Sequence, residues 1–307
     1  MQTAVVTGAA GFVGCNLVEC LLEYGYYVYA VVRPGSAHNS RLRESERLKL
    51  VYADMSEFGQ LAEKIDDTAD IFFHIAWGGN RYNFAEQWQN IEATLGALRS
   101  AKILGAKRFV ATGSQAEYGP QTELITEETL PHPIDAYGSV KLATCIMSRQ
   151  LALDMDIEWI WGRIFSVYGK YEPHGRMLSD LINALTDGNS FSLSAATQYW
   201  DYLYSSDCAE ALVALGERGC PGEIYNIANG DCRPLREFTE IIRSVVDSSR
   251  TLCYGEAPGV VYSLMVKADK IKADTGWEPV VDFAEGVAFV LRINQEVDYG
   301  KEHRKHV

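Results

Sequence analysis

The amino-terminal half of this chain alternates short apolar runs with stretches of helical periodicity, and this alternation limits the possible folds more than any other feature. The apolar runs are rich in Val, Ile, Phe, Tyr and Trp, which is typical of strands that are buried on both faces. They cover residues 3–7, 27–32, 48–53, 71–76, 109–112 and 159–163. Because repeated strand–helix units fold into a parallel sheet with right-handed crossovers, we expect an α/β fold with a doubly wound parallel sheet.

Helical periodicity fills the spaces between these runs and continues beyond them. Apolar residues recur at helical spacing from Val13 to Leu22, and Gly25 stands where that helix should end. Further helices are predicted over 84–104, 137–155, 207–217, 235–247 and 282–293. Glycine and proline interrupt the later part of the chain more often. We therefore predict a sheet domain over 1–165, with return segments near 199–228, and a smaller, discontinuous lobe over 166–307.

The composition argues against several classes of protein. The net charge of −13 disfavours nucleic-acid binding, which needs a basic face, so an anionic ligand would need a local cluster of Arg or Lys. The seven cysteines are odd in number and form no CxxC pair, which predicts reduced thiols and no metal site. The sequence has no signal-peptide pattern and no apolar run of the roughly 20 residues that a membrane span needs. We therefore expect a cytoplasmic protein with no nucleic-acid partner and no membrane partner.

A glycine-rich loop joins the first strand to the first helix, with the sequence Gly8-Ala9-Ala10-Gly11-Phe12-Val13-Gly14. Glycines at such a junction allow a tight turn and let backbone N–H groups approach a pyrophosphate at the positive end of the helix. A tight turn without a ligand is the alternative, but strand, loop, helix and second strand follow here in the order of a dinucleotide-binding unit. We therefore predict that Gly8, Gly11, Phe12, Val13 and Gly14 contact a dinucleotide cofactor.

Tyr137 and Lys141 stand four residues apart on one face of a predicted helix. A free tyrosine has a pKa of about 10, and lowering it to near 7 takes roughly 4 kcal/mol of differential stabilisation. One adjacent cation supplies about one to three pKa units, so we expect Lys141 and a positively charged nicotinamide ring to lower the pKa of Tyr137 together. Such a pair often occurs by chance on an exposed helix face, but this one follows the fifth predicted strand of a chain with a glycine loop.

The glycine loop, whose spacing is GxxGxxG, and the pattern of Tyr137 and Lys141 make the chain resemble the extended short-chain dehydrogenase/reductases. Within that family the chain resembles the branch of nucleotide-sugar epimerases, dehydratases and 4-ketoreductases. The resemblance implies a Rossmann-like, dinucleotide-binding domain over 1–165 and a mainly substrate-binding lobe over 166–307. It also implies that Ser114 is the third catalytic residue, with Thr112 as the alternative.

The same resemblance implies further contacts at the strand ends and a nucleotide-diphosphate sugar as substrate. The implied cofactor contacts after the third to sixth strands are Asp54, Met55, Ile75, Ala76, Trp77, Thr112 and Ile164, together with Tyr137 and Lys141. The implied substrate contacts are Trp77, Ser114, Gln115, Tyr137, Ser166 and Trp200. Two of these positions depart from the family pattern. Ser166 stands where many members have Asn, and Trp200 replaces a usual Arg.

The end of the second strand bears on the choice of cofactor. A carboxylate there would bind the adenosine ribose of NAD, whereas a cation would pair with the 2′-phosphate of NADP. The strand is followed by Arg33, with Arg41 and Arg43 nearby, and no Asp or Glu stands at that point. Since arginine pairs with phosphate bidentately, we expect NADP as the preferred cofactor, with NAD as the alternative.

The residues after Ser114 bear on the reaction. Family members that remove water from the sugar resemble one another in having Asp-Glu directly after the catalytic Ser or Thr, as acid and base. Here Gln115 and Ala116 stand there, and Glu117, one position later, should point the opposite way on an extended segment. We therefore expect NADPH-dependent reduction of a 4-keto-6-deoxy sugar. The alternatives are an epimerase with tightly bound NAD, a reductase of small phenolic ketones, and a non-catalytic, cofactor-sensing relative.

The two long predicted helices over 84–104 and 137–155 bear on assembly. They carry more apolar residues than one sheet face needs, among them Leu95, Leu98, Leu142, Ile146 and Met147. In the family that the chain resembles, these helices of two subunits pair into a four-helix bundle. We therefore predict a homodimer with an isologous contact.

Overall fold

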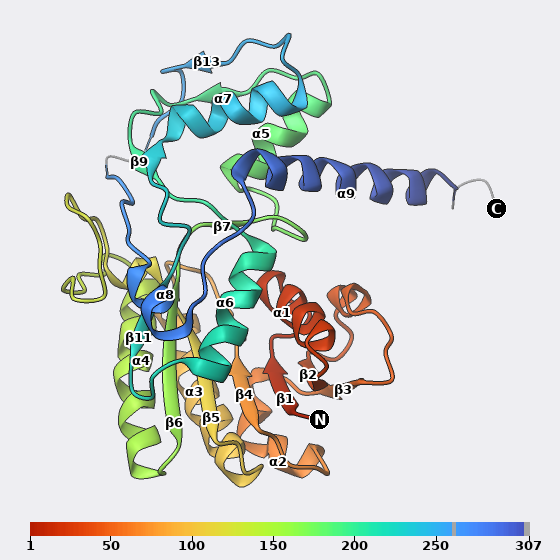
Figure 1. Ribbon diagram of the computed structural model, residues 1–307, viewed down its shortest axis with the longest axis vertical. Helices are drawn as coiled ribbons and strands as arrows, with labels where there is room; N and C mark the ends of the chain where they lie inside the picture. The colour runs from red at the N-terminus through yellow and green to blue at the C-terminus, as the bar shows by residue number, and fades with distance from the viewer. Residues whose placement is uncertain (260–261, 304–307) are drawn as a thin grey trace.

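A parallel sheet of seven strands lies at the centre of the computed structural model, which describes residues 1–259 and 262–303 (Figure 1). Its strands are β1 (Thr3–Thr7), β2 (Tyr27–Val32), β3 (Leu48–Tyr52), β4 (Ile71–His74), β5 (Arg108–Ser114), β6 (Glu158–Ile164) and β11 (Ile224–Ile227). They are ordered β11-β6-β5-β4-β1-β2-β3, and all neighbours are parallel. The predicted α/β fold with a doubly wound parallel sheet is confirmed. The strand order reverses between β1 and β4, which opens a crevice at their carboxyl ends.

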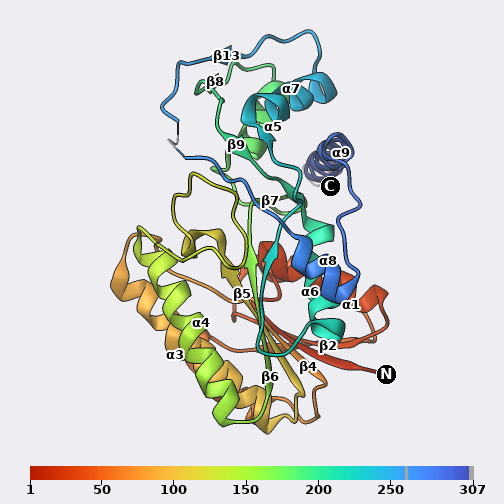
Figure 2. The same ribbon diagram turned by 60° about the vertical axis from the view of Figure 1, so that its left-hand side comes forward.

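Helices cover both faces of this sheet (Figure 2). On one face α1 (Phe12–Glu23) packs beside α6 (Ser205–Arg218), and on the other α3 (Phe84–Ile103) packs beside α4 (Ala136–Asp154). Short helical segments complete this part: η1 (Ala37–Arg41), η2 (Met55–Gln60), α2 (Leu61–Lys64) and η3 (Gln115–Glu117). Successive side chains of a strand point to opposite faces of the sheet, so each strand contributes to the hydrophobic core on both faces. Phe73 belongs to the core under α1 and α6, whereas Phe72 belongs to the core under α3 and α4.

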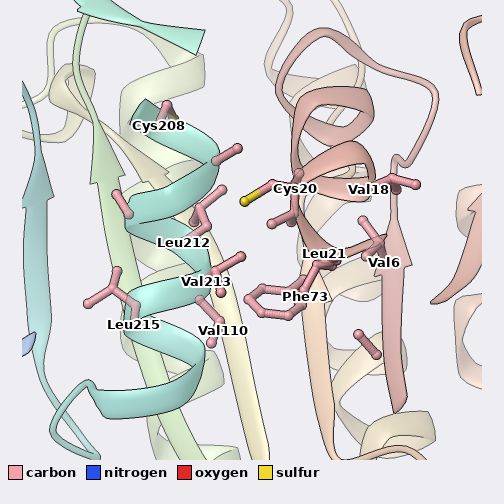
Figure 3. Packing of buried hydrophobic residues seen from close by; sticks show 14 of the residues in the cluster. Val6, Val18, Cys20, Leu21, Phe73, Val110, Cys208, Leu212, Val213 and Leu215 are labelled. Atoms are coloured by element: carbon pink, nitrogen blue, oxygen red, sulfur yellow. The ribbon is translucent and has the colours of Figure 1, made fainter. Parts of the chain in front are cut away.

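The core under α1 and α6 consists mainly of aliphatic side chains around an aromatic ring of the sheet (Figure 3). Leu21 of α1 and Leu212 of α6 are fully buried in the same cluster as Phe73 of β4. At the end of α1, Gly25 has a φ of +85°, and the Tyr26 N–H donates to the Leu21 carbonyl at 2.9 Å. The left-handed backbone that favours glycine therefore ends this helix where the sequence predicted.

The remaining elements form a smaller lobe beyond the carboxyl edge of the sheet (Figure 1). Its helices α5 (Met177–Thr186), α7 (Leu235–Val246) and α9 (Phe283–His303) surround a separate core that contains Tyr168, Phe238 and Phe283. The later chain also contains helix α8 (Asp269–Thr275) and the short strands β7 (Val167–Tyr168), β8 (Ser192–Leu193), β9 (Tyr199–Trp200), β10 (Leu203–Tyr204), β12 (Arg233–Pro234) and β13 (Cys253–Tyr254). After β10 the chain returns to the sheet as α6 and β11. The domain border near residue 165 stays a prediction.

The observed elements depart from the predicted ones mainly at their ends. β5 continues to Ser114 instead of ending at Thr112, so the predicted catalytic serine is the last residue of the strand. α9 begins one residue later than predicted and continues to His303. β11 was not predicted as a strand, although its partner β6 was. No helix within residues 1–259 and 262–303 is long and apolar enough to cross a membrane.

The apolar residues that suggested a dimer divide into two groups. Leu95 and Leu98 are only 8% and 0% exposed, so the expectation that they belong to a subunit contact is wrong. They face the interior of their own chain, where α3 packs on the sheet and on α4. Leu142 is half-buried, whereas Ile146 and Met147 of α4 are 62% and 42% exposed. Ile146 and Met147 are therefore the predicted contact residues that are free to meet a second chain, and the homodimer stays a prediction.

We expect light scattering at micromolar concentration to give the mass of two chains. Replacing both Ile146 and Met147 with Glu should give the mass of one chain, because unpaired charge in an apolar contact is strongly unfavourable. Val280→Glu is the matched control, since Val280 is 75% exposed and lies in the smaller lobe, and it should keep the two-chain mass. A single-chain mass for the unmodified protein would contradict the prediction.

Candidate active site

A cavity of about 1500 Å³ opens at the carboxyl ends of the sheet strands, between the sheet and the smaller lobe. All residues that the sequence predicted for catalysis, cofactor binding or substrate binding line it: Gly8, Gly11, Phe12, Val13, Gly14, Arg33, Asp54, Met55, Ile75, Ala76, Trp77, Thr112, Ser114, Gln115, Tyr137, Lys141, Ile164, Ser166 and Trp200. The fold thus brings together the ends of six strands and one strand of the smaller lobe. The structure shows that these residues line one cavity, and the role of each residue stays a prediction.

The turn after β1 brings its backbone close to β4 and to α1. Gly8 has a φ of +69°, and a Cβ there would lie 2.7 Å from the backbone nitrogen of Ala76. A Cβ on Gly14 would overlap the carbonyl oxygen of Gly8. Gly11 is the N-cap of α1, and within residues 1–259 and 262–303 no side chain caps the first N–H groups of that helix. Uncapped backbone donors at a helix N-terminus suit a pyrophosphate, so the residues present fit a dinucleotide cofactor.

The sheet side of the cavity contains two exposed arginines, Arg33 and Arg99, whose side chains make no hydrogen bond or ion pair with the described residues. Arg33 follows β2, lines the cavity and is exposed. Arg41 instead donates to the Ala10 carbonyl at 3.3 Å, and its guanidinium lies 5.0 Å from the centre of the Tyr171 ring. Asp54 follows β3, and its carboxylate caps η2 by accepting from the backbone N–H of that segment. Among the arginines that follow β2, Arg33 is therefore the one that lines the cavity and is available to a ligand phosphate.

Tyr137 lies in the first turn of α4, where two neighbouring groups hold it. The carboxylate of Asp135 caps the helix by accepting from the Gly138 N–H at 2.8 Å, and it also accepts from Arg81 Nε at 2.6 Å. The guanidinium of Arg81 lies 4.9 Å from the centre of the Tyr137 ring. The helix cap stabilises the first turn of α4, and the guanidinium of Arg81 contacts the Tyr137 ring in that turn.

The pKa of Tyr137 depends mainly on its burial. Burial raises the pKa of Tyr137, and this effect outweighs Ser114 and the charge of Arg81, which lower it. The expectation that Lys141 and a positively charged nicotinamide ring lower this pKa together stays a prediction. The ammonium group of Lys141 donates to the Thr112 carbonyl at 2.6 Å.

Lys141 is 3% exposed, and its ammonium group lies against an aromatic face. The Lys141 nitrogen is 3.6 Å from the centre of a Trp77 ring, and Trp77 Nε1 donates to Gln87 at 2.8 Å. Burial lowers the pKa of Lys141 to about 7, although the carboxylate of Glu117 opposes this shift. A cation on an aromatic face keeps part of the stabilisation that it loses on leaving water. Lys141 therefore titrates near neutral pH.

Ser114 and Thr112 were the two candidates for the third catalytic residue, and the structure separates them. The Thr112 hydroxyl donates to the His74 carbonyl at 3.5 Å. The Ser114 oxygen accepts from the Ala116 N–H at 3.2 Å, and Ser114 lowers the pKa of Tyr137 against the larger effect of burial. Because Ser114 lies beside Tyr137 in this way, whereas the Thr112 hydroxyl donates to a backbone carbonyl, Ser114 is better placed than Thr112 to act with Tyr137 on one carbonyl oxygen.

Glu117 contradicts the expectation of an extended segment after Ser114. The chain turns there as η3, which carries the Glu117 side chain into the interior, where it is 0% exposed. Its carboxylate pairs with Arg163 and cannot act as a free acid or base in the cavity. Gln115 lines the cavity, and its buried Oε1 has no hydrogen-bond partner among the described residues. The wall after Ser114 thus offers a neutral amide where a dehydratase needs a carboxylate.

The smaller lobe contributes cavity residues that sequence reasoning missed. Glu172, Arg176 and Tyr202 line the cavity beside Ser166 and Trp200. Burial raises the pKa of Glu172 to about 7, and the charge of Arg176 opposes the shift. Glu172 and Arg176 lie in a glycine- and proline-containing segment that follows the sixth strand of the sequence. That position, at the carboxyl edge of a parallel sheet, is the signal that could have identified them.

The family of the chain follows from comparison with known proteins. A model of the NAD dependent epimerase/dehydratase family matches residues 4–228, and the chain belongs to this family. The curated relatives include a UDP-glucose 4-epimerase from Mycolicibacterium smegmatis, which is 26% identical over 92% of this chain and 96% of its own length. Protein CapI from Staphylococcus aureus is 23% identical over 98% of this chain and 99% of its own length.

Solved structures have the same fold. The UDP-glucose 4-epimerase from Thermotoga maritima, solved with UDP-glucose, superposes with a TM-score of 0.86 at 22% identity and covers 96% of this chain and 99% of its own. The protein MoeE5, solved with UDP-glucuronic acid and NAD, superposes with a TM-score of 0.82 at 26% identity. That comparison covers 96% of this chain and 100% of the MoeE5 chain.

Gly14→Ala should weaken the binding of a nicotinamide dinucleotide by about tenfold or more, since about 1.4 kcal/mol of lost binding energy is tenfold in affinity. The new Cβ would overlap the Gly8 carbonyl oxygen and push α1 away from the turn over residues 8–14, which we call the glycine cradle. The free energy of unfolding should fall by about 1–3 kcal/mol, as overpacking usually costs. Fluorescence titration with the reduced cofactor and denaturant unfolding measure the two effects.

Gly59→Ala is the control for this variant, because a Cβ on Gly59 would make only an ordinary contact of 3.8 Å with Gly96. Its free energy of unfolding should stay close to that of the unmodified protein. If Gly14→Ala binds the cofactor as tightly as the unmodified protein, the cradle is not the phosphate site.

Proposed function

We propose that this member of the NAD dependent epimerase/dehydratase family reduces the C4 carbonyl of a nucleotide-linked 4-keto-6-deoxy sugar, with NADPH as the reductant. The observation that carries the proposal is the meeting of Ser114, Tyr137 and Lys141 at one wall of the cavity. Such a set suits the transfer of a hydride and a proton to a carbonyl group. A non-catalytic, cofactor-sensing protein would have no need of it.

Tyr137 is the proton donor in this proposal. Because burial raises the pKa of Tyr137, its hydroxyl is protonated at neutral pH, which is the form that reduction requires. When bound, NADPH would supply the hydride for C4. Tyr137 would give its proton to the carbonyl oxygen, so that a secondary alcohol forms. Ser114 donates a hydrogen bond to this oxygen as negative charge develops on it. Its oxygen already accepts from Ala116, which leaves its own proton for the cavity.

Two features of the cavity support reduction over dehydration. Gln115 and Ala116 carry no ionisable side chain, so the acid and base that remove water from a sugar are missing at these positions. Arg33 lines the cavity after β2, where its charge suits the 2′-phosphate of NADPH. A reductase consumes its nicotinamide cofactor and must exchange it at every turnover, whereas an epimerase keeps it.

An epimerase with tightly bound NAD is the second candidate, and the similarity to a UDP-glucose 4-epimerase supports it. In that reaction Tyr137 would first remove a proton from a C4 hydroxyl and later return it, with no net loss of cofactor. Arg33 lines the cavity after β2, and no Asp or Glu stands at that strand end, which favours NADPH as a consumed cofactor, and we therefore place reduction first.

A nucleoside-diphosphate sugar is the substrate that we propose for either reaction. MoeE5 and the Thermotoga maritima epimerase were both solved with a UDP sugar. In this chain the cavity extends from the catalytic wall to Arg176 of the smaller lobe, whose charge suits a diphosphate. The cavity wall there also contains Trp200, in the position where many family members have Arg.

Arg33→Ala should weaken NADPH binding by roughly tenfold or more, because a charge-assisted hydrogen bond contributes about 1.5–3 kcal/mol. NADH, which has no 2′-phosphate, should bind nearly unchanged. Arg43→Ala is the matched control, since Arg43 is exposed in the same region, and it should change neither affinity. Equal weakening of both cofactors by Arg33→Ala would show that Arg33 does not read the phosphate.

The reaction itself is tested by offering 4-keto nucleotide sugars with NADPH and following the absorbance of the reduced cofactor. We expect one NADPH to be oxidised for each sugar reduced. Tyr137→Phe should lower the rate by about 10²–10⁴-fold, the usual contribution of a general acid, while the cofactor still binds. Tyr24→Phe is the control, because Tyr24 is 53% exposed and lies at the end of α1. Interconversion of two hydroxyl epimers without net NADPH loss would favour the epimerase instead.

A further inference from the structure

Glu117 is a fully buried carboxylate directly behind the proposed catalytic residues, and the mechanism above gives it no task. It accepts three hydrogen bonds from groups of different segments. The donors are the Ser114 N–H at 2.9 Å, Trp161 Nε1 at 3.0 Å and Arg163 Nε at 2.8 Å. Burying a charge without partners is very costly, so this environment is built for a carboxylate.

The first of these contacts holds the turn that carries Ser114. Glu117 accepts from the Ser114 N–H, and the Ser114 oxygen accepts from the N–H of Ala116, which together close the start of η3. The fit around this turn is tight, because a Cβ on Gly113 would overlap both the Trp161 ring and the Glu117 carboxylate. The orientation of the Ser114 hydroxyl therefore depends on the position of Glu117.

Arg163 in turn keeps Glu117 in place. Arg163 is 2% exposed, and its guanidinium lies 4.4 Å from the centre of the Tyr118 ring. The Tyr118 hydroxyl donates to Asn226 Oδ1 at 2.8 Å, which ties this wall to β11 at the edge of the sheet. A carboxylate held by a rigid partner cannot swing into the cavity, so Glu117 acts only through the groups that it touches or faces.

Glu117 and Lys141 lie on either side of Trp161, whose Nε1 donates to Glu117 at 3.0 Å and whose ring centre is 5.9 Å from the Lys141 nitrogen. Burial lowers the pKa of Lys141 to about 7, and the carboxylate of Glu117 is the charge that opposes this effect. The other buried groups around the ammonium are not anions at neutral pH. Burial lowers the pKa of His74 in β4 to about 3 and raises the pKa of Tyr137 and of Cys145 in α4, so all three are neutral.

The charged groups on the remaining neighbouring elements do not replace Glu117. Arg163 of β6 is a cation and is paired with Glu117 itself. Glu86 and Glu92 of α3 line the cavity but are exposed to solvent, which screens their charges. Among the described residues that surround Lys141, Glu117 is thus the buried anion.

We propose that Glu117 is a positioning residue of the active site, which holds the turn of Ser114 and supplies the negative charge opposite the buried ammonium of Lys141. The inference rests on the proposed function, because it assigns Ser114 to the carbonyl and Lys141 to the bound cofactor. The inference adds a requirement for a carboxylate at position 117, beside the three residues Ser114, Tyr137 and Lys141. A neutral side chain at position 117 impairs the site even when Ser114, Tyr137 and Lys141 are intact.

The test compares Glu117→Gln with the unmodified protein, using NADPH affinity measured by cofactor fluorescence from about pH 5 to about pH 10, which covers the lowered pKa of Lys141, a further shift toward acid and most of the range up to the normal pKa of lysine. Affinity should fall as the pH rises through the pKa of Lys141, because the cavity loses a cation. Without the carboxylate the pKa of Lys141 is lower still, so the fall should move toward acid by about one pH unit. Glu127→Gln is the matched control, since Glu127 accepts from the Asn226 N–H at 2.8 Å, and its curve should coincide with that of the unmodified protein.

In Glu117→Gln the buried Arg163 guanidinium loses its anionic partner, and an unpaired buried charge destabilises a fold. The double variant Glu117→Gln/Arg163→Met avoids this because it removes both charges. It should fold, and its curve should lie between those of the other two proteins. Hydrogen exchange of the unmodified protein gives a third readout, in which the Ser114 amide should be strongly protected. Coincident curves for folded Glu117→Gln and the unmodified protein, or a Ser114 amide that exchanges as fast as an exposed loop, would overturn the proposal.

These readouts separate the inference from the proposed function. Cofactor affinity and amide exchange need no sugar substrate, so they report on Glu117 even if no 4-keto sugar is reduced. A failure of the sugar assay with the expected shift in the affinity curve would overturn only the proposed reaction. Normal sugar reduction with unchanged curves would overturn only the role of Glu117. A merely structural carboxylate would lower the melting temperature and leave the pH dependence where it was.

Discussion

The reversal of strand order between β1 and β4 is the constraint on which the candidate active site depends. The two strands send their following helices to opposite faces, so a crevice remains at their carboxyl ends. A buried imidazole ties the strands together at this point. The Thr94 hydroxyl donates to the Asn90 carbonyl at 2.8 Å and therefore accepts from His74 Nε2 at 3.0 Å, which leaves His74 Nδ1 to accept from the Thr7 hydroxyl at 2.9 Å. Because burial lowers the pKa of His74 to about 3, this neutral link between β1, β4 and α3 persists at any ordinary pH.

A second constraint is electrostatic, because the site keeps several charges inside the protein. Lys141, Glu117 and Arg163 are each no more than 3% exposed. Apolar residues of similar volume are often as stabilising as a buried ion pair, so stability alone does not explain this set. Fully satisfied polar networks do hold their members in one geometry, however, and a carbonyl reaction needs its proton donor and its hydrogen-bond donor at fixed places. The buried charges are therefore better explained by the chemistry on the cavity side than by the packing behind it.

The sequence predicted the features that depend on neighbouring residues, and it missed those that depend on residues distant along the chain. Strand periodicity and glycine spacing are properties of neighbouring residues, so the bounds of β1 and β2 and the turn at Gly8 were predictable. The direction of a side chain after a strand depends on backbone that the pattern does not specify. Glu117 was expected to point away on an extended segment, but η3 turns it inward toward Arg163, which is distant in the sequence. The surroundings of Lys141 were unpredictable for the same reason, since its partners come from β5 and from the segment after β4.

The two sides of the cavity contribute differently to function. The sheet side contains the glycine cradle and the set of Ser114, Tyr137 and Lys141, which resemble the family pattern and suit chemistry that many family members share. The smaller lobe contains the departures from that pattern, Ser166 and Trp200, and Trp200 lies with its ring 6.3 Å from that of Tyr262. An indole in the place of a guanidinium cannot pair with a phosphate, but it offers a flat apolar face to a sugar or a base. In the proposed reaction the substrate would find its phosphate contacts elsewhere and place an apolar part, such as a deoxygenated sugar carbon, against the indole. The proposed chemistry thus depends on the sheet edge, whereas the proposed choice of substrate depends on the smaller lobe.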